Sequence, residues 1–382
     1  MTKQSILIAG AGIGGLTAAL TLHARGFDVT VVDRAQELKP LGVGINLLPH
    51  AVRELAALGM GEELSRISVA PTAIAFFDSA GTELFREPRG VDGGYDHPQL
   101  SVHRGRLQMM LLDAVTVRIG RDVVRTGAGV TAFAHDGDAV AVDTEAGRVR
   151  ADALVGADGI NSVVRAALHP DDGPLLWSGV RMFRGATPHE SFLDGHTMVI
   201  IKGEGGIDLV AYPIGGGLLN WVIQLPAGTP GPLEGDAAWN RHADAGEVAA
   251  LTAHWQLDWL DVSGMVNSTD EVLEYPMVDK DALPRWGEGR VTLLGDAAHP
   301  MYPVGANGGS QAILDARVLA DELDNDVDAG LRRYEEKRRK DTADVVAANR
   351  EMHCAGASRH PHELASVTTN YRRKTHADRR HA

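Results

Sequence analysis

Residues 5–33 contain two apolar runs separated by a stretch of helical character. The first run covers residues 6–9 and the second covers residues 29–32, and helix-forming residues between them continue to Arg25 and stop at Gly26. Short apolar runs bounded by glycine are typical of buried strands. The pattern therefore predicts a β-strand, an α-helix and a second strand that lies parallel to the first.

Strand-like segments return in two separate parts of the chain. These segments are separated by glycine-rich turns and contain no long helical period. They are residues 73–77, 83–86, 180–185, 197–201, 208–214 and 220–225. Such segments pair most readily as an antiparallel sheet. The sequence therefore predicts a second, mostly antiparallel unit set between parts of the first unit.

The remaining segments alternate between helix and strand patterns. Residues 123–150 alternate as a small antiparallel meander, and the apolar strands 151–156 and 290–295 each run into a turn that contains aspartate and glycine. Strands with such ends face the ligand side of an α/β sheet. Within one expected helix, Trp255 and Trp259 lie four positions apart and are expected to pack one face on the sheet. Helices are expected at 49–58, 107–117, 237–260 and 311–323, with two more after a break near 324–328.

The turn after the first strand reads Gly-Ala-Gly-Ile-Gly-Gly at residues 10–15. Gly10 permits the tight turn, Gly12 lets a pyrophosphate reach backbone N–H groups at the helix N-terminus, and Gly15 lets helix and strand approach closely. Asp33 follows the second strand, where a carboxylate accepts hydrogen bonds from a ribose. The complete strand–helix–strand segment with its terminal acid predicts a bound dinucleotide.

Composition and charge exclude several other functions. Residues 5–22 carry no charge, but their four glycines and the lack of a cleavage site argue against a membrane span or signal peptide. The net charge of −14 argues against a nucleic-acid surface, which needs basic patches. Cys354 is the single cysteine, so we expect no disulfide, no metal site and, by default, a cytoplasmic protein. A basic end is expected to be solvated and partly disordered: Arg372, Arg373, Lys374, Arg379 and Arg380.

Three stretches together resemble the signature of single-component FAD-dependent aromatic hydroxylases, the type of p-hydroxybenzoate and salicylate hydroxylases. They are GAGIGG at 10–15, VGADGINSVVR at 155–165 and RVTLLGDAAHPMYPVGANGGSQAILDA at 290–316. They follow the order and spacing of the family over nearly the whole chain. Within the family, four further stretches are most similar to the methylphenazine-carboxylate monooxygenases of pyocyanin biosynthesis, at 41–46, 103–109, 209–214 and 275–286.

The resemblance implies an α/β fold in which a Rossmann-type FAD-binding domain carries an inserted, mostly antiparallel β-sheet domain for the substrate. The FAD-binding domain would consist of residues 1–70, 97–178 and 277–350. The substrate domain would consist of residues 71–96 and 179–276, and residues 351–382 would form a C-terminal helix and the basic tail.

The resemblance also implies which residues contact FAD. The pyrophosphate would lie on the glycine-rich turn and on Arg104, for which a surface position is the alternative, and the ribityl chain would lie on Asp296. Asp33, where the family more often has glutamate, would bind the adenosine ribose, and Asp158 would contact both FAD and NAD(P)H. The implied cofactor-binding residues are Gly10, Gly12, Gly14, Gly15, Asp33, Arg34, Gly44, Ile45, Arg104, Asp158, Asp296, Gly305, Gly308 and Gly309.

The implied reaction is hydride transfer from NADH or NADPH to FAD, followed by O₂ addition and oxygen transfer through a C4a-hydroperoxyflavin. The substrate would be an aromatic or polycyclic aromatic acid, hydroxylated with or without decarboxylation. The chain has no second GxGxxG, as expected for a nicotinamide that visits the flavin transiently. The main alternative is an NAD(P)-dependent dehydrogenase or reductase that transfers no oxygen. A halogenase and a non-catalytic binder are less favoured.

Candidate residues for substrate binding and catalysis are fewer. Tyr212, Tyr302 and His50 are candidate bases for a phenol, with a packing role as the alternative for each. Arg184 is a candidate partner for a substrate carboxylate, with a solvent-facing position as the alternative, and Pro303 is a candidate substrate contact. His299, beside Asp296, is expected to have a structural role. The expected partners are a small aromatic substrate and O₂, with no nucleic acid, membrane or metal, in a monomer or homodimer.

Overall fold

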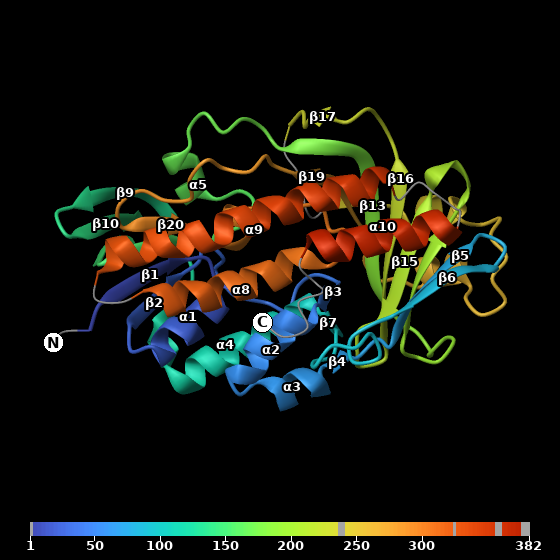
Figure 1. Cartoon of the computed structure of the whole chain (residues 1–382), viewed down its shortest axis with the longest axis horizontal. Coiled ribbons are helices and arrows are strands. Elements are labelled where there is room, and N and C mark those ends of the chain that lie inside the picture. The colour runs from blue at the N-terminus through green and yellow to red at the C-terminus, as the bar shows by residue number, and fades with distance from the viewer. Residues whose placement is uncertain (1–2, 236–240, 324–325, 356–360, 376–382) are drawn as a thin grey trace.

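Two large sheets lie toward opposite ends of the molecule (Figure 1). The computed structural model describes residues 3–235, 241–323, 326–355 and 361–375. None of the helices in this part of the chain combines the length and the apolar character that crossing a lipid bilayer requires.

The first sheet is parallel and has five strands. Its central strand, β1, pairs with β12 on one side and with β2 on the other. The four side chains of β1 that follow Ser5 are buried, which explains the unbroken apolar run in the sequence. The predicted strand–helix–strand start is confirmed, with α1 as its helix (Ile13–Ala24). The strand order is β20 (Val291–Leu293), β12 (Ala153–Gly156), β1 (Ser5–Ala9), β2 (Asp28–Val32) and β8 (Val124–Arg125).

Helices pack around this sheet and against one another. Helix α1 packs against α8 (Asn307–Glu322) and α4 (Arg104–Arg118), while α8 also contacts α2 (Pro49–Ala57) and α9 (Val327–Ala355). Helix α8 begins four residues earlier than predicted, because Gly308 and Gly309, which disfavour helix in a sequence reading, lie in its first turn. The smaller helices are α3 (Gly61–Arg66) and α5 (Val163–Leu168).

Two three-stranded sheets complete this half of the molecule. The predicted meander is confirmed as β9 (Val130–Asp136), β10 (Ala139–Thr144) and β11 (Gly147–Ala151). The second small sheet places β7 (Leu100–His103) between β3 (Gly44–Leu47) and β4 (Ser68–Val69). Strand β3 contacts the second large sheet, since its first residue, Gly44, packs against Asn220 of that sheet.

The second large sheet is mostly antiparallel, as predicted, and among its pairings only that of β14 with β5 is parallel. The chain enters it twice, because β5 and β6 come from residues before 90 and the other strands from residues 176–279. Its order is β18 (Arg241–His242), β19 (Leu273–Asp279), β13 (Leu176–Pro188), β16 (Leu218–Pro226), β15 (Asp208–Pro213), β14 (Thr197–Lys202), β5 (Ala73–Asp78) and β6 (Glu83–Pro88), with β17 (Gly231–Pro232) paired to β13.

The prediction of a helix over residues 237–260 is largely wrong, and residues 237–240 lie outside the described part. The described residues form α6 (Ala245–Ala250) and then turns before α7 (Val262–Asn267). Asp244 and Asp261 each cap one of these short helices, so the chain stops and restarts instead of continuing as one helix. Trp255 and Trp259 are therefore not in a helix, although Trp259 packs 4.8 Å from the Phe77 ring of the sheet.

The two further predicted helices are confirmed as α9 and α10 (Pro361–Lys374). Figure 1 shows α9 running along both halves, with α10 beside it toward the second sheet. Leu364 of α10 packs on the apolar cluster of that sheet around Phe76. The expected solvated tail is wrong for Arg372, whose side chain is 19% exposed and pairs with Glu87 at 2.6 Å. Arg379 and Arg380 lie outside the described residues.

Candidate active site

The glycine-rich turn is tightly packed on three sides and open on the fourth. Gly10 has a φ of +104°, and a Cβ there would lie 2.3 Å from the Ala157 carbonyl oxygen. A Cβ on Gly15 would lie 2.0 Å from the Gly10 carbonyl oxygen, and one on Gly14 would meet α8. At Gly12 a Cβ would have no atom within 4 Å. The turn therefore excludes side chains where helix and strands meet, and opens at Gly12, at the N-terminus of α1.

Asp33 holds the turn together through its carboxylate. Its Oδ2 accepts a hydrogen bond from the Ala11 N–H at 2.7 Å, and its Oδ1 accepts one from the Ala35 N–H at 2.8 Å. Each oxygen retains a second lone pair, so these contacts leave room for a ribose hydroxyl. The ribose contact stays a prediction. Arg34 beside it is exposed.

Segments far apart in the sequence meet near the start of α8. A Cβ on Gly308 would lie 3.8 Å from Asp296 Oδ1, and one on Gly309 would lie 3.7 Å from Ile45 Cδ1. The predicted ring-binding segments and the predicted ribityl-binding carboxylate are thus neighbours in space. Gly305, with a φ of +70°, precedes this helix start.

Asp296 and Arg104 lie close enough for their charges to influence each other. Both side chains are exposed to water. The surrounding protein nevertheless raises the pKa of Asp296 and lowers the pKa of Arg104 by desolvation, and each charge partly offsets the shift of the other. A guanidinium and a carboxylate at this place, together with the open helix N-terminus at Gly12, offer the donors and acceptors that suit a dinucleotide with a pyrophosphate and sugar hydroxyls.

The Asp158 carboxylate forms hydrogen bonds with residues that follow closely in the chain. Its Oδ1 accepts a hydrogen bond from the Ser162 hydroxyl at 2.5 Å, and its Oδ2 accepts one from the Val163 N–H at 2.8 Å. Ser162 itself caps α5. Desolvation raises the pKa of Asp158, and these hydrogen bonds offset part of that shift. Its predicted contacts with FAD and NAD(P)H stay predictions.

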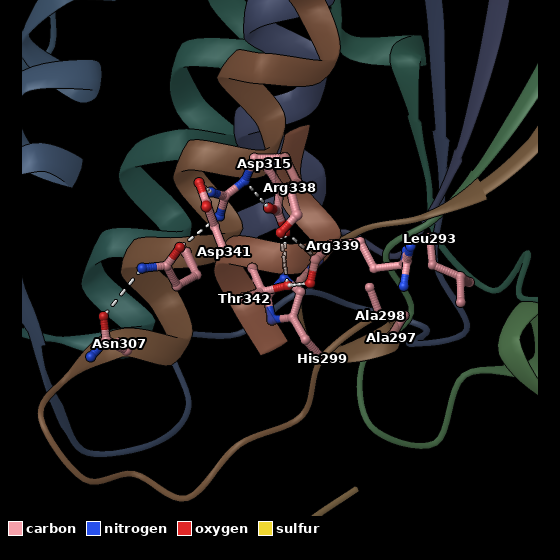
Figure 2. A network of polar contacts seen from close by, with 12 residues as sticks. Leu293, Ala297, Ala298, His299, Asn307, Asp315, Arg338, Arg339, Asp341 and Thr342 are labelled. Atoms are coloured by element: carbon pink, nitrogen blue, oxygen red, sulfur yellow. Dashed lines mark hydrogen bonds and ion pairs between the residues drawn. The ribbon is translucent and has the colours of Figure 1, made fainter. Parts of the chain in front are cut away.

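A buried ionic network behind Asp296 was missed by the sequence reading (Figure 2). Asp315 Oδ2 accepts hydrogen bonds from the Gly295 N–H at 3.0 Å and from His299 Nε2 at 2.6 Å. Arg338 donates to Asp315 Oδ1 at 2.7 Å. Burial alone would raise the pKa of Asp315, but the charges and hydrogen bonds of His299 and Arg338 lower it to about 2. The expected structural role of His299 is confirmed. Asp315 is one of several charged residues in its helical segment, and nothing in the local sequence distinguishes it.

The inner face of the antiparallel sheet carries buried donors without partners. The Arg184 guanidinium carbon lies 4.0 Å from the centroid of the Tyr275 ring. Arg184 Nε and Asn220 Nδ2 are buried and have no hydrogen-bond acceptor among the described residues. The charge of Arg184 acts on both Arg104 and Tyr212, which places it near these two side chains. Of the predicted substrate residues, the structure thus brings Arg184 and Tyr212 together.

The other predicted residues are placed differently. Tyr302 packs in a buried cluster with Met182 and with Tyr275, the ring on which Arg184 is stacked, and burial raises the pKa of Tyr302 to about 12. Pro303 is exposed. His50 Nε2 is buried without a described partner, and burial lowers the pKa of His50 to about 4. The described residues contain no group of three or more His, Cys, Asp or Glu side chains that could hold a metal ion.

The parallel sheet with its glycine-rich turn, the antiparallel sheet and the charged pair of Asp296 and Arg104 define a dinucleotide-dependent oxidoreductase of the flavoprotein type. The family of FAD binding domains matches residues 3–349 of the chain. The chain is 46% identical over 395 residues to phenazine 1,6-dicarboxylic acid hydroxylase PhzS of Lysobacter antibioticus, covering 97% of each protein. It is 34% identical to 3-hydroxybenzoate 6-hydroxylase 1 of Aquipseudomonas alcaligenes, covering 91% of this chain and 88% of that protein.

Among solved structures, HpxO of Klebsiella pneumoniae in complex with FAD and uric acid superposes with a TM-score of 0.80. The two chains are 25% identical, and the match covers 98% of this chain and 93% of that one. The chain belongs to the FAD-binding family of aromatic hydroxylases. It is a flavoprotein monooxygenase that uses FAD, with NADH or NADPH as co-substrate. The alternative of a dehydrogenase without oxygen transfer is not supported.

Proposed function

We propose that this enzyme hydroxylates a fused-ring aromatic carboxylic acid, with phenazine carboxylates as the first candidates. The observation that carries the proposal is the buried, unpartnered Nε of Arg184 on the inner face of the sheet. The 46% identity to a phenazine 1,6-dicarboxylic acid hydroxylase supports the same substrate class.

Arg184 is suited to bind a carboxylate. No carboxylate of the described residues lies within ion-pair distance of it, and its guanidinium is stacked on the Tyr275 ring instead. The Arg184 side chain is half-buried and its Nε is shielded from water, so an anionic ligand beside Arg184 would supply the missing hydrogen-bond acceptor. Asn220 Nδ2, also without a partner among the described residues, adds a neutral donor on the neighbouring strand.

Tyr212 is better suited to orient the substrate than to act as a base. Burial raises the pKa of Tyr212 well above neutral, and the nearby Arg184 charge and the Asn220 and Asn46 amides offset only part of that shift. Its hydroxyl therefore stays protonated and can donate a hydrogen bond to a substrate oxygen. Tyr302, in its separate apolar cluster, is assigned a packing role.

The cofactor assignments follow the open backbone at Gly12 and the positions of three charged side chains. We propose that the turn at Gly12 and the Arg104 guanidinium hold the pyrophosphate of FAD, that Asp33 holds the ribose, and that Asp296 holds the ribityl chain. When bound, FAD supplies the hydride acceptor and the O₂ chemistry. The remaining task of the protein is to exclude water and to fix the ring of the substrate. The residues assigned to the flavin ring are Gly44, Ile45, Gly305, Gly308 and Gly309.

The division into an FAD-binding domain and a substrate domain, as given above, forms part of this proposal. We also propose a cytoplasmic location. Cys354, the single cysteine, is free and exposed, and NADH and NADPH are intracellular reductants.

The decisive experiment is stopped-flow reduction of the FAD enzyme by NADH and by NADPH in the presence of candidate substrates. The panel contains phenazine mono- and dicarboxylates, salicylate, hydroxybenzoates and unsubstituted phenazine. We expect a phenazine carboxylate to accelerate flavin absorbance loss the most and to return with one added oxygen by mass spectrometry. Equal acceleration by unsubstituted phenazine would contradict the carboxylate assignment. Acceleration by monocyclic acids alone would contradict the fused-ring assignment.

A further inference from the structure

Asp315 is placed to control the turn that presents Asp296 to the cofactor. The turn runs from Gly295 to His299, and Asp296 is its second residue. Asp315 Oδ2 accepts hydrogen bonds from the backbone N–H of the first residue, at 3.0 Å, and from the side chain of the last, at 2.6 Å. One oxygen atom therefore accepts hydrogen bonds from both ends of the turn. The Asp315 side chain is fully buried.

The other oxygen of Asp315 is fixed by α9. Arg338 Nε donates to Oδ1 at 2.7 Å, and Arg338 Nη2 donates to Gln311 Oε1 at 2.6 Å. Figure 2 shows His299 and Arg338 approaching Asp315 from different sides. Both oxygens thus have charge-assisted or backbone partners, and the carboxylate has little freedom to rotate. The contact with Asp315 also places the proton of His299 on Nε2.

The effect of Asp315 on Asp296 is geometric. The negative charge of Asp315 by itself raises the pKa of Asp296, which disfavours the ionised form, while His299 lowers it. A direct electrostatic role would therefore work against Asp296 as a hydrogen-bond acceptor. What Asp315 contributes is the fixed position of residues 295 and 299 on either side of it.

We propose that Asp315 is a positioning residue for FAD, which acts by holding the Gly295–His299 turn so that Asp296 meets the ribityl hydroxyls. This inference rests on the proposed role of Asp296. Residues that orient a ligand-binding group commonly change ligand affinity by roughly 10- to 100-fold when replaced. Asp315→Asn is the sharpest change, because an amide has a single acceptor oxygen and serves either Arg338 or the turn, but not both.

The test is a double-mutant cycle on FAD affinity, measured by quenching of flavin fluorescence when apoprotein is titrated. We expect Asp315→Asn to raise the Kd for FAD on the order of tenfold or more in the wild-type background. In the Asp296→Asn background, we expect the same change to have nearly no effect on Kd, since no carboxylate remains to be positioned. The matched control is Asp321→Asn on the same helix, a partly exposed residue paired with Arg25 and Arg317, which we expect to leave Kd unchanged.

Other outcomes separate the inference from the proposal beneath it. If Asp315→Asn raises Kd by the same factor in both backgrounds, the effect is generally structural and the inference is wrong. If Asp296→Asn alone leaves Kd unchanged, the role proposed for Asp296 is wrong. Should Asp315→Asn fail to fold, Arg338→Lys tests the same idea more mildly, because the lysine retains the charge but cannot contact both Asp315 and Gln311. Equal effects of Arg338→Lys in both backgrounds would likewise overturn the inference.

Discussion

At the scale of single residues, Arg184 gives the most direct prediction about the substrate. Replacing it by methionine removes the unpartnered cation and keeps most of the side-chain volume. We expect Arg184→Met to raise the Kd of a carboxylated substrate by roughly tenfold or more, since a lost charge-assisted hydrogen bond is worth about 1.5–3 kcal/mol. Substrate titration monitored by the flavin spectrum measures this effect.

The control for this experiment is Arg181→Met on the same strand. Arg181 is 42% exposed and pairs with Glu274 at 2.8 Å, so its removal is expected to leave substrate affinity unchanged. An uncarboxylated analogue should bind the wild type and Arg184→Met equally well. If both analogues lose affinity by the same factor, Arg184 is not a carboxylate partner.

The glycines of the first turn allow a paired prediction. In Gly15→Ala, the Cβ 2.0 Å from the Gly10 carbonyl forces the helix and strand apart, and we expect the apoprotein to lose roughly 1–3 kcal/mol of unfolding free energy. In Gly12→Ala, the methyl group enters open space, so the fold should persist while FAD binds more weakly. Urea unfolding of apoprotein and FAD titration separate the two effects. Wild-type FAD affinity in Gly12→Ala would contradict the pyrophosphate assignment.

Sequence reasoning at this scale identified residues whose chemistry follows a local motif. The turn 10–15, Asp33 and Asp296 each sit directly after an apolar strand, and that position is visible in the sequence. Asp315 and Arg338 were missed because the contacts of Asp315 join α8 to the Gly295–His299 turn, 16 residues away, and to α9, 23 residues away. Nothing in either local stretch marks these partners before the helices are packed.

At the scale of elements, α10 shows how a polar, basic segment becomes part of the structure. Its sequence suggests a solvated tail, yet Tyr371 and Leu364 are buried against the rest of the protein. Tyr371 lies between the loop before α8 and helix α9, where its hydroxyl bonds with Asn307 and Asn349 side chains at 2.5 Å each. The docking depends on partners from three distant segments, so the sequence of α10 alone does not reveal it.

This arrangement predicts the effect of Tyr371→Phe. The substitution removes one hydroxyl and leaves the Asn307 and Asn349 side chains buried with unsatisfied polar atoms. We expect a loss of about 1–3 kcal/mol in the free energy of unfolding, measured by urea denaturation. Tyr334→Phe is the matched comparison, because the Tyr334 hydroxyl bonds only with the Leu293 carbonyl among the described residues, and it should cost less. An unchanged unfolding midpoint in Tyr371→Phe would show that α10 is not held at this point.

The absence of the single helix predicted over residues 237–260 also has a physical cause at the scale of elements. Its apolar spacing resembles a helix, but Asp244 and Asp261 cap separate short helices, and the segment between them turns to place Trp255 and Trp259 on the sheet. Burial of two large rings in the tertiary structure outweighs local helix propensity here.

At the scale of the whole molecule, the fold class was predictable because two different patterns occupy separate stretches. Strands alternate with helices in one half, and strands joined by glycine-rich turns, with no long helical period, make up most of the other half. The way in which α8, α9 and the Gly295–His299 turn join at a buried ionic centre was not predictable, because charged residues in amphipathic helices usually face water. Because Asp315 in this centre is ionisable, the free energy of unfolding of the protein is expected to depend on pH.

Asp315 is expected to make the apoprotein sensitive to acid in a defined range. The pKa of Asp315 is lowered from 3.8 to about 2 in the folded protein, so its ionised form is favoured by folding. This contribution is fully present above about pH 4, and it is lost as the pH falls toward 2, where the folded protein must also take up the proton. Its size is on the order of 2 kcal/mol. Urea unfolding of apoprotein at pH 7, 4 and 2.5 measures the loss.

Other carboxylates also titrate in this range, so the comparison with Asp315→Asn isolates the effect. The variant should be less stable than the wild type at pH 7, since Arg338 loses its buried counter-charge and His299 loses its carboxylate hydrogen-bond partner. Its stability should then fall less steeply than that of the wild type between pH 4 and 2.5, because the group that titrates is absent. Asp321→Asn should follow the wild-type curve throughout. Parallel curves for wild type and Asp315→Asn would mean that the pKa of Asp315 does not differ between the folded and the unfolded protein, and the ionic centre would then not be the acid-sensitive element of this fold.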